Sequence, residues 1–447
     1  MQLFGTDGIR GDASKFPFDC KTLNIIGKSI AQILGKKGRI FIIRDTRQSG
    51  KRIQKHLSAG IESVGSKAIL GGVMPTPAAS FVVASHKFSC AVAISASHNH
   101  YRDNGIKIFN SRGLKLTDTI ERKIEIAVNE HLKKETKIKN QKIPSIEDKM
   151  FLKLYENFII DSSHVKNIQG KTIILDCANG SAFKSAPKVF KKLGAKVIVL
   201  NVKPNGKNIN LNCGALYPKN LSIAVKKHKA FGGFAFDGDA DRLICIDEKG
   251  IIRDGDFFLS SMAFWLKKHG KLKNNVLIST VMANIGVVQS LKSRNIKFVA
   301  SKVGDRYVIE DMKKHKASLG GEQSGHFIFN DFLPTGDGLL SAVMLLNAVT
   351  AENATMSEFM NVISKFPQIL ISKKVHRKIP IEHLKKTQKL LKQHEEELGT
   401  NGRILVRYSG TENILRVMVE GKSLSNIKNI AQNLASSIIK EIKESIK

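Results

Sequence analysis

Short apolar segments and amphipathic segments alternate along most of the chain. Residues 39–44 and 90–95 are rich in apolar side chains, many of them β-branched, which predicts buried strands. Residues 51–64 carry apolar side chains at helical spacing, which predicts a helix between those strands. Strands that alternate with helices indicate parallel α/β layers. We therefore expect the N-terminal region to form an α/β domain.

The same alternation starts twice more along the chain. A helix predicted over residues 182–193 lies between two strands, and Gly194 just beyond it suits a left-handed helix cap. A third round begins near Gly255. The strands predicted in these two regions are 172–176, 196–200, 276–280 and 297–300. We expect three similar α/β units.

Beyond about residue 367 the pattern changes. A basic helix precedes two strands, 403–408 and 414–419, and an amphipathic helix starts at Leu424. This order predicts a smaller α+β domain. The 447 residues exceed what one core usually organises, and the lysine-rich stretch 132–144 marks the end of the first domain. The predicted domains are 1–150, 151–250, 251–366 and 367–447.

The chain is strongly basic, with 72 Lys and Arg against 39 Asp and Glu and a formal net charge of +33. The lysines are scattered along the whole length, and no nucleic-acid-binding motif accompanies them. We therefore expect a solvated, lysine-rich surface that attracts anionic substrates, with no specific nucleic acid as partner. An inactive nucleic-acid binder on an enzyme fold is the alternative of a different class.

The other bulk properties are those of a cytoplasmic protein. Apolar stretches such as 257–266 are too short to span a bilayer, so we expect no membrane insertion. The first eight residues lack the basic and apolar regions of a signal peptide. Five cysteines without a Cys-x-x-Cys pair indicate reduced thiols.

The run 93–107 ends an apolar strand in a dense set of polar side chains. Such a strand end is presented to a ligand rather than continued into a core. Ser95 and Ser97 both stand where a nucleophile would stand, and the residues alone leave the choice between them open. His98 and Lys107 follow in the same run.

Asp237, Asp239 and Asp241 supply three carboxylates at alternate positions. Hard oxygen ligands at this spacing predict a divalent-metal loop, typically for Mg²⁺. An EF-hand is disfavoured because Arg242 replaces the glycine at position six and the flanking residues read as strands. A solvated acidic turn is the structural alternative.

Two further loops suit a phosphorylated sugar. The first, at residues 407–413, combines arginines, hydroxyls and a glycine that can bind an oxyanion, although a plain hairpin loop would look similar. The second, at 321–326, brings a carboxylate, a hydroxyl and an imidazole together. Two glycine-bounded basic segments, 4–11 and 44–50, either place an arginine beside an anion or form structural turns.

Taken together and in this order, these segments resemble one family, the α-D-phosphohexomutases. The matching blocks are 4–11, 75–77, 94–99, 103–107, 237–242, 322–326 and 407–412, and they cover essentially the whole chain. The resemblance implies a four-domain architecture, three similar α/β domains and a smaller C-terminal α+β domain, around a central cleft. Gln323 stands where the phosphomannomutase/phosphoglucomutase branch typically has Met.

The resemblance also implies a reaction. It suggests interconversion of glucosamine 6-phosphate and glucosamine 1-phosphate, on the route to UDP-N-acetylglucosamine. One Mg²⁺ per chain and a glucosamine or glucose 1,6-bisphosphate intermediate or activator belong to this expectation. Phosphomannomutase/phosphoglucomutase activity is the alternative in the same class, and the monomer or homodimer state stays open.

The implied roles centre on Ser97 as the phosphorylated serine. Its phosphate oxygen and the three aspartates would hold the metal, and Lys107 would transfer protons. The other residues implied near the reaction are Arg10, His326 and His98. Those implied to bind the sugar are Arg242, Gly304, Asp305, Arg306, Glu322 and Ser324. Those implied to bind the non-reacting phosphate are Arg407, Ser409, Gly410, Thr411 and Arg416.

Two positions depart from the family pattern. His100 and Asn413 each stand where proline is usual. Since proline restricts the residue before it, its loss at position 100 should loosen Asn99 and cost at most about 1 kcal/mol. We expect a small effect at both positions, with an added cation beside the phosphoserine as the alternative role of His100.

Overall fold

The computed structural model describes the chain except for residues 1, 6, 36, 135–145, 165–167, 410–412 and 446–447. Most of the predicted stretch 132–144 lies outside the described residues. The chain forms two compact units, which are described separately: residues 1–282 with 296–362, and residues 283–295 with 363–447. Among the described helices, none is long and apolar enough to cross a lipid bilayer.

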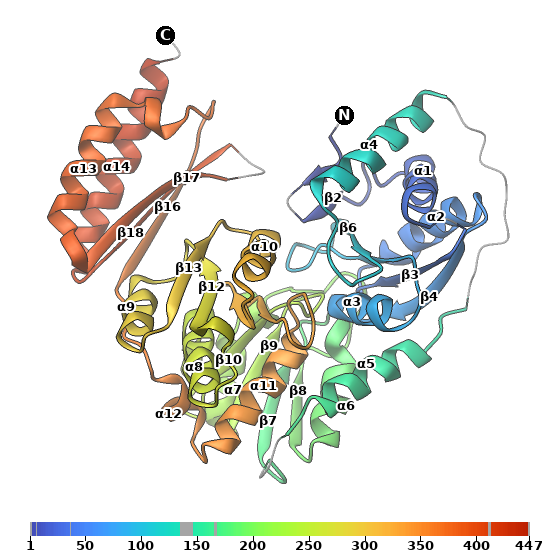
Figure 1. The fold of residues 1–447 in the computed structure, drawn as a ribbon, viewed down its shortest axis with the longest axis horizontal. Coiled ribbons are helices and arrows are strands. Elements are labelled where there is room, and N and C mark those ends of the chain that lie inside the picture. The colour runs from blue at the N-terminus through green and yellow to red at the C-terminus, as the bar shows by residue number, and fades with distance from the viewer. Residues whose placement is uncertain are drawn as a thin grey trace. The chain divides into compact units, whose positions relative to one another are not determined.

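The first sheet has the strand order β1-β2-β6-β5-β3-β4. Its strands are β1 Phe4–Gly5, β2 Gly8–Asp12, β3 Arg39–Arg44, β4 Lys67–Val73, β5 Cys90–Ile94 and β6 Asp103–Asn110. The helices around it are α1 Cys20–Ile30, α2 Gly50–Glu62, α3 Thr76–Ser85 and α4 Asp118–Lys133. Ile40 and Ile42 of β3 pack with α1 and α2 residues, whereas Phe41 packs against Phe88 and Phe151. Strand β3, which lies between β5 and β4, is therefore covered on both faces (Figure 1).

The second sheet has the order β11-β10-β9-β7-β8. Its strands are β7 Thr172–Asp176, β8 Lys196–Leu200, β9 Gly232–Phe236, β10 Leu243–Ile246 and β11 Ile252–Arg253, and its helices are α5 Met150–Asp161, α6 Ser185–Lys192 and α7 Lys219–Lys227. The single helix predicted over 182–193 was wrong, because a 3₁₀ turn, Ser181–Phe183, precedes α6. Pro187 has no N–H to donate to the Phe183 carbonyl, so regular helix begins within one turn of it. Gly194 has the predicted positive φ, 94°.

The third sheet has the order β13-β12-β14-β15. Its strands are β12 Val276–Thr280, β13 Lys297–Ser301, β14 Leu319–Gly321 and β15 Phe327–Phe329. The helices of this region are α8 Gly255–Lys268, α10 Asp305–His315, α11 Gly338–Ala351 and α12 Met356–Met360. Residues of β12, β15 and α10 share one apolar cluster. These elements complete the first unit.

The second unit is built on an antiparallel sheet of order β16-β18-β17. Its strands are β16 Gln368–Lys374, β17 Gly402–Tyr408 and β18 Ile414–Gly421, and its helices are α9 Ile285–Ser293, α13 Lys385–Leu398 and α14 Leu424–Glu444. The apolar face of α14 packs on the sheet. The buried Glu420 on β18 accepts hydrogen bonds from Asn284 Nδ2 at 3.1 Å and the Ile285 amide at 3.1 Å, and so attaches α9.

The sheets are mixed rather than wholly parallel, which corrects one part of the sequence prediction. In the first unit the parallel pairs form one side of each sheet, over β5-β3-β4, β9-β7-β8 and β13-β12-β14. The pairs β5–β6, β9–β10 and β14–β15 are antiparallel. Their connections, 95–102, 237–242 and 322–326, are too short for the crossover that a parallel pair needs. The serine, aspartate and sugar-binding segments of the first unit are therefore short loops between antiparallel neighbours, whereas the segment 44–50 connects β3 to α2.

Candidate active site

The loop between β9 and β10 brings three carboxylates together. Asp237, Asp239 and Asp241 are buried, and one oxygen of each lies within 4.8 Å of the other two. Oδ1 of Asp239 and Oδ1 of Asp241 accept no hydrogen bond from the described residues. Because the flanking elements are strands, the loop is not an EF-hand.

The electrostatics of this loop fit a hard divalent cation. Burial, reinforced by the charges of Asp241 and Asp239, raises the pKa of Asp237 well above its usual range. Crowded buried carboxylates with spare acceptor oxygens are unfavourable until a cation joins them. The donor set present here therefore fits Mg²⁺.

Ser97 lies directly against this loop. It is 1% exposed, and its hydroxyl donates to Asp237 Oδ2 at 2.6 Å. Its backbone is left-handed, with φ of 53°, a conformation that costs a non-glycine residue free energy. Hydrogen bonds to its carbonyl from Arg47 Nη2 and Asn210 Nδ2, both at 2.9 Å, stabilise that conformation.

Ser95 has a different environment. Its hydroxyl donates to Asp45 Oδ2 at 2.7 Å and accepts the Ser97 amide at 2.9 Å. Both hydrogen bonds hold the serine loop in place, and neither involves Asp237, Asp239 or Asp241. Of the two serines, Ser97 has the geometry of a group that reacts beside a metal.

Lys107 lies among the carboxylates. Its Nζ is 2.9 Å from Asp239 Oδ2, 3.0 Å from Asp241 Oδ2 and 3.3 Å from Asp7 Oδ2. Burial alone would lower the pKa of Lys107, but these three charges hold it well above its usual value. The amine is therefore an ammonium group in this arrangement and has no lone pair with which to accept a proton.

A chain of alternating charges continues from Asp7. Asp7 forms ion pairs with Arg10 and Lys115, and Lys115 also pairs with Asp305 at the start of α10. His326 links this series of ion pairs back to the metal loop. Its Nε2 lies 3.5 Å from Asp305 Oδ2, and its Nδ1 lies 3.9 Å from Asp241 Oδ2. The network joins all three sheets of the first unit at one place.

His98 completes the surroundings of the serine. Its Nδ1 lies 3.2 Å from Ser97 Oγ. Burial, helped by the charges of Arg242 and Arg10, lowers the pKa of His98 to about 4. The neutral ring is thus a hydrogen-bonding partner of the serine at ordinary pH.

The loop between β14 and β15 carries the predicted sugar-binding residues. Glu322 accepts the Gly304 amide at 3.0 Å through Oε1 and the Ser324 hydroxyl at 3.2 Å through Oε2. Ser324 is exposed. The structure therefore brings Gly304, Glu322 and Ser324 together, and Asp305 follows directly.

The two arginines predicted to bind the sugar differ from each other. Arg306 already pairs with Asp118, Glu121 and Glu310. Arg242 lies beside the metal loop, its amide donates to Asp237 Oδ1 at 3.2 Å, and its buried Nε has no hydrogen-bond partner among the described residues. Arg242 has unused donor capacity toward the catalytic loops, whereas Arg306 is engaged by carboxylates.

The hairpin of β17 and β18 in the second unit groups the predicted phosphate-binding residues that can be described. Arg407 and Arg416 are directly opposite each other in the β-ladder. The Ser409 amide donates to the Ile414 carbonyl at 2.8 Å, and the Ser409 carbonyl accepts Lys378 Nζ at 2.7 Å. Gly410 and Thr411 lie outside the described residues. Lys378 adds a third cation that the sequence did not single out.

Models of the four domains of one enzyme family match the chain in order. Phosphoglucomutase/phosphomannomutase alpha/beta/alpha domains I, II and III match residues 1–135, 148–250 and 254–366, and the C-terminal domain matches residues 370–437. The chain belongs to this mutase family. The predicted family and the four-domain fold class are thereby confirmed, and the chain is an isomerase of the phosphohexomutase type. The exact domain boundaries stay a prediction.

Individual mutases resemble the chain over its whole length. Phosphoglucosamine mutase of Chlamydia caviae is 42% identical over 450 residues, which cover 99% of this chain and 97% of the relative. A phosphoglucomutase/phosphomannomutase family protein of Burkholderia thailandensis has the same fold, with a TM-score of 0.80 at 20% identity over 98% of this chain and 97% of that one.

Two solved structures of Aspergillus fumigatus N-acetylphosphoglucosamine mutase also share the fold at 17% identity. One, in complex with GlcNAc-6P and magnesium, has a TM-score of 0.64 and covers 99% of this chain and 96% of its own. The other, in complex with glucose 1,6-bisphosphate, has a TM-score of 0.66 and covers 98% and 95%.

Within this mutase fold, sequence reasoning missed what the 44–50 segment does. Arg47 is fully buried, pairs with Asp45 at 2.8 Å and donates to the carbonyls of the serine loop. Those carbonyls belong to Ser97, Asn99, His100 and Asp103. The segment is a structural turn, as one of the two interpretations had it, but its ion pair is buried rather than on the surface, and it supports the loop that carries Ser97.

Other supporting residues were given no role by the sequence, although the block 75–77 matched the family pattern. Thr76 fixes the metal loop, since its hydroxyl donates to Asp239 Oδ2 at 2.8 Å and its amide to the Asp239 carbonyl at 2.8 Å. Lys115 and Asn210 were missed because an isolated lysine or asparagine has many ordinary roles. His100, in the usual proline position, is exposed, and its ring lies 4.4 Å from that of Tyr101.

Proposed function

We propose that this mutase interconverts glucosamine 6-phosphate and glucosamine 1-phosphate through a phosphoserine at Ser97. The observation that carries the proposal is the Ser97 hydroxyl, 2.6 Å from Asp237 in a buried cluster of three aspartates. The 42% identity to phosphoglucosamine mutases over nearly the full chain supports the amino-sugar substrate.

The reaction has two phosphoryl transfers. In the first, the phosphorylated Ser97 gives its phosphoryl group to the free hydroxyl of the monophosphate, so that the serine O–P bond breaks and a sugar O–P bond forms. In the second, the sugar 1,6-bisphosphate has turned over and returns its other phosphate to Ser97. A protein relay is needed because the two sugar positions cannot exchange a phosphate directly in one pose.

The proton balance involves groups around the serine. The sugar hydroxyl loses a proton and Ser97 Oγ regains one, and in the dephosphorylated state Asp237 Oδ2 accepts the hydrogen bond of that proton. Lys107 is the proposed proton-transfer group, with Arg10 and His326 beside it. Since its carboxylate partners keep it charged here, Lys107 must lose a proton before it acts as a base.

Asp237, Asp239 and Asp241 would hold Mg²⁺, with an oxygen of the phosphoserine. When bound, the ion would neutralise the negative charge that develops on the phosphoryl group during its transfer. Two carboxylate oxygens in the loop accept no hydrogen bond from the described residues, which supports this assignment.

The remaining residues would bind the substrate. Glu322 and Ser324 would contact sugar hydroxyls, together with Arg242 and the 304–306 turn. In the second unit, Arg407, Ser409 and Arg416, with Gly410 and Thr411, would bind the non-reacting phosphate. Binding of that remote group supplies free energy for positioning the reacting hydroxyl.

A substrate panel tests the proposal. Purified protein, charged with glucose 1,6-bisphosphate, is assayed in parallel with the 6-phosphates of glucosamine, glucose and mannose by ³¹P NMR. We expect the highest kcat/KM for glucosamine 6-phosphate. A higher value for glucose or mannose 6-phosphate would instead assign the chain to phosphoglucomutase/phosphomannomutase activity. Intact-mass measurement gives the phosphorylation state independently of the substrate.

The cellular location is also a proposal. The five cysteines are all free thiols, and four of them are buried. Free thiols are typical of a reducing compartment, which supports the cytoplasm as the place of action.

A further inference from the structure

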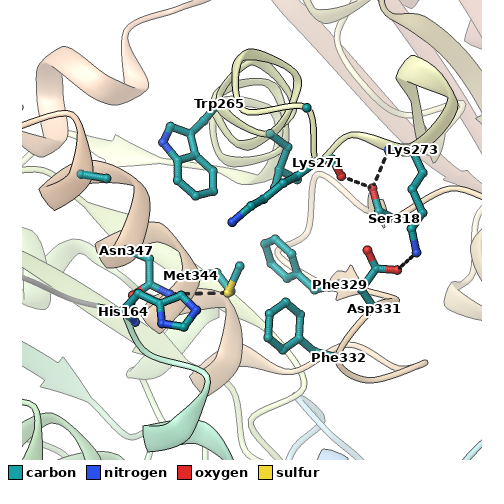
Figure 2. Close-up of a pocket in the computed structure, with 13 residues that line it drawn as sticks. His164, Trp265, Lys271, Lys273, Ser318, Phe329, Asp331, Phe332, Met344 and Asn347 are labelled. Atoms are coloured by element: carbon teal, nitrogen blue, oxygen red, sulfur yellow. Dashed lines mark hydrogen bonds and ion pairs between the residues drawn. The ribbon is translucent and has the colours of Figure 1, made fainter.

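A pocket of about 400 Å³ lies in the first unit apart from the serine, aspartate and sugar-binding loops. Among the described residues, its lining includes none from 93–107, 237–242 or 321–326. It is formed by the end of α8, the segment after β15 and the second half of α11 (Figure 2). No part of the proposed mutase reaction uses it.

The pocket walls are aromatic and apolar. Trp265, Phe329, Phe332 and Met344 face the space from different sides (Figure 2). Phe332 is 39% exposed, so this wall reaches the solvent. Apolar walls with an open edge favour a flat, small ligand over a polymer, because a small ring can be covered on both faces.

The polar groups of the pocket are mostly used by the protein itself. Ser318 Oγ accepts the Lys273 amide and donates to the Lys271 carbonyl, both at 3.2 Å. Asn347 donates to the Ser162 carbonyl at 3.1 Å and accepts the His164 amide at 2.8 Å. These groups position the walls and leave little capacity for a ligand.

Three lysines around the pocket differ in their ion pairs. Lys273 pairs with Asp331, and Lys268 pairs with Glu352 at 2.6 Å. Lys271 forms no ion pair with any described residue, and its Nζ lies 5.9 Å from the centre of the Trp265 ring system. Figure 2 shows this amine pointing into the space between the aromatic walls. An uncompensated cation at an apolar surface favours an anion.

We propose that this pocket binds a small planar anion, an aromatic ring system that carries a carboxylate or sulfonate. The ring would lie against Trp265 and the phenylalanines, and the anionic group would meet Lys271 Nζ. The proposal does not depend on the sugar substrate, since no catalytic residue lines the pocket.

The full-length protein permits a direct test, because Trp265 is its single tryptophan. The probe is 8-anilinonaphthalene-1-sulfonate, which accepts energy from tryptophan and quenches its emission. We expect saturable quenching at one probe per chain that excess glucosamine 6-phosphate does not displace. Lys271 is exposed, so Lys271→Gln should weaken probe binding about 2- to 5-fold, the loss of one charge pair at the surface.

Two controls make the test specific. Lys219→Gln changes the net charge equally on an exposed residue of α7 that does not line the pocket, and it should leave binding unchanged. N-phenyl-1-naphthylamine lacks the sulfonate and should bind the wild-type and Lys271→Gln proteins equally. Equal affinity of the sulfonate for these two proteins, or its displacement by the sugar phosphate, would overturn the proposal.

A second variant locates the probe without touching the charge. Ala351→Phe places a large ring at a lining position on the exposed end of α11 and should abolish binding. Retained affinity in an Ala351→Phe protein with unchanged thermal melting would show that the probe binds elsewhere. If that variant does not fold, the probe affinities of the Lys271→Gln and Lys219→Gln proteins decide whether the proposal holds.

Discussion

Two groups of buried carboxyl side chains in the first unit differ in how their charge is satisfied. In the metal loop, Asp239 and Asp241 pair with Lys107, and one oxygen of each accepts no hydrogen bond from the described residues. At the start of α11, Asp337 accepts the Tyr155 hydroxyl at 2.8 Å and 2.9 Å and the Leu340 amide at 3.0 Å.

The difference separates a reactive group from a structural one. Neutral donors satisfy Asp337, and burial raises its pKa to about 7. It caps a helix and needs no ion. The loop aspartates have cationic neighbours and unused acceptors, an arrangement that is costly unless a ligand completes it. Burial alone therefore does not identify a functional carboxylate. In this comparison, carboxylate oxygens that accept no hydrogen bond from the described residues distinguish the metal loop from Asp337.

Loss of the nucleophile should have the largest effect. Ser97→Ala removes the atom that carries the phosphoryl group, so turnover should fall by about 10⁴-fold or more and phosphoenzyme should be absent. Activity and intact mass after treatment with glucose 1,6-bisphosphate measure both. Ser95→Ala is the matched control and should still be phosphorylated at Ser97. A phosphoprotein in the Ser97→Ala variant would contradict the assignment.

Weakening the metal loop should have the next largest effect. Asp237→Asn keeps the shape and removes one charge, so kcat should fall by about 10²- to 10³-fold and the Mg²⁺ concentration for half-maximal rate should rise. The rate is measured in a magnesium titration at saturating substrate. Asp337→Asn removes a buried carboxyl group of the other kind and should leave the magnesium titration unchanged. An unchanged titration for Asp237→Asn would remove the distinction between the two groups.

Changing Arg47, which holds the serine loop in place, should lower kcat less than changing Ser97 or Asp237. Lysine at position 47 cannot reach four carbonyls and Asp45 together, so Arg47→Lys should lower kcat by about 10- to 100-fold through misplacement of Ser97. Arg52→Lys is the matched control, because Arg52 donates to the Phe18 and Ala13 carbonyls of the same domain. It should lower the Tm and leave kcat unchanged. Equal kcat losses in both variants would indicate a general effect on folding.

The smallest effect on activity is expected at the helix cap, where the change is one of stability. Since the pKa of Asp337 is raised to about 7 in the folded chain, the folded state holds this proton more tightly than the unfolded state. The stability from this group is complete below about pH 4 and is lost as pH rises toward 7, at up to about 1 kcal/mol per pH unit. Asp337→Asn should flatten the pH dependence of urea unfolding over that window. The same slope in the variant would exclude Asp337 as its source.

Much of the site could be predicted because its groups are local in sequence. The Asp237, Asp239 and Asp241 spacing and the polar end of β5 are visible without a fold. The antiparallel edges could have been predicted from the short connections 95–102 and 237–242. The partners of Lys107 could not, since its nearest carboxylates are more than 130 positions away.

The elements and the available chemistry follow from local features of the chain, because apolar periodicity sets strands and helices and motif spacing sets which donors share a loop. Which donors meet depends on how the elements pack. The tertiary structure separates Ser97, directed at Asp237, from Ser95, held by Asp45, and it makes Arg47 a support for the serine loop. Those choices depend on hydrogen bonds between residues distant in the chain, whose geometry exists only after the sheets have packed.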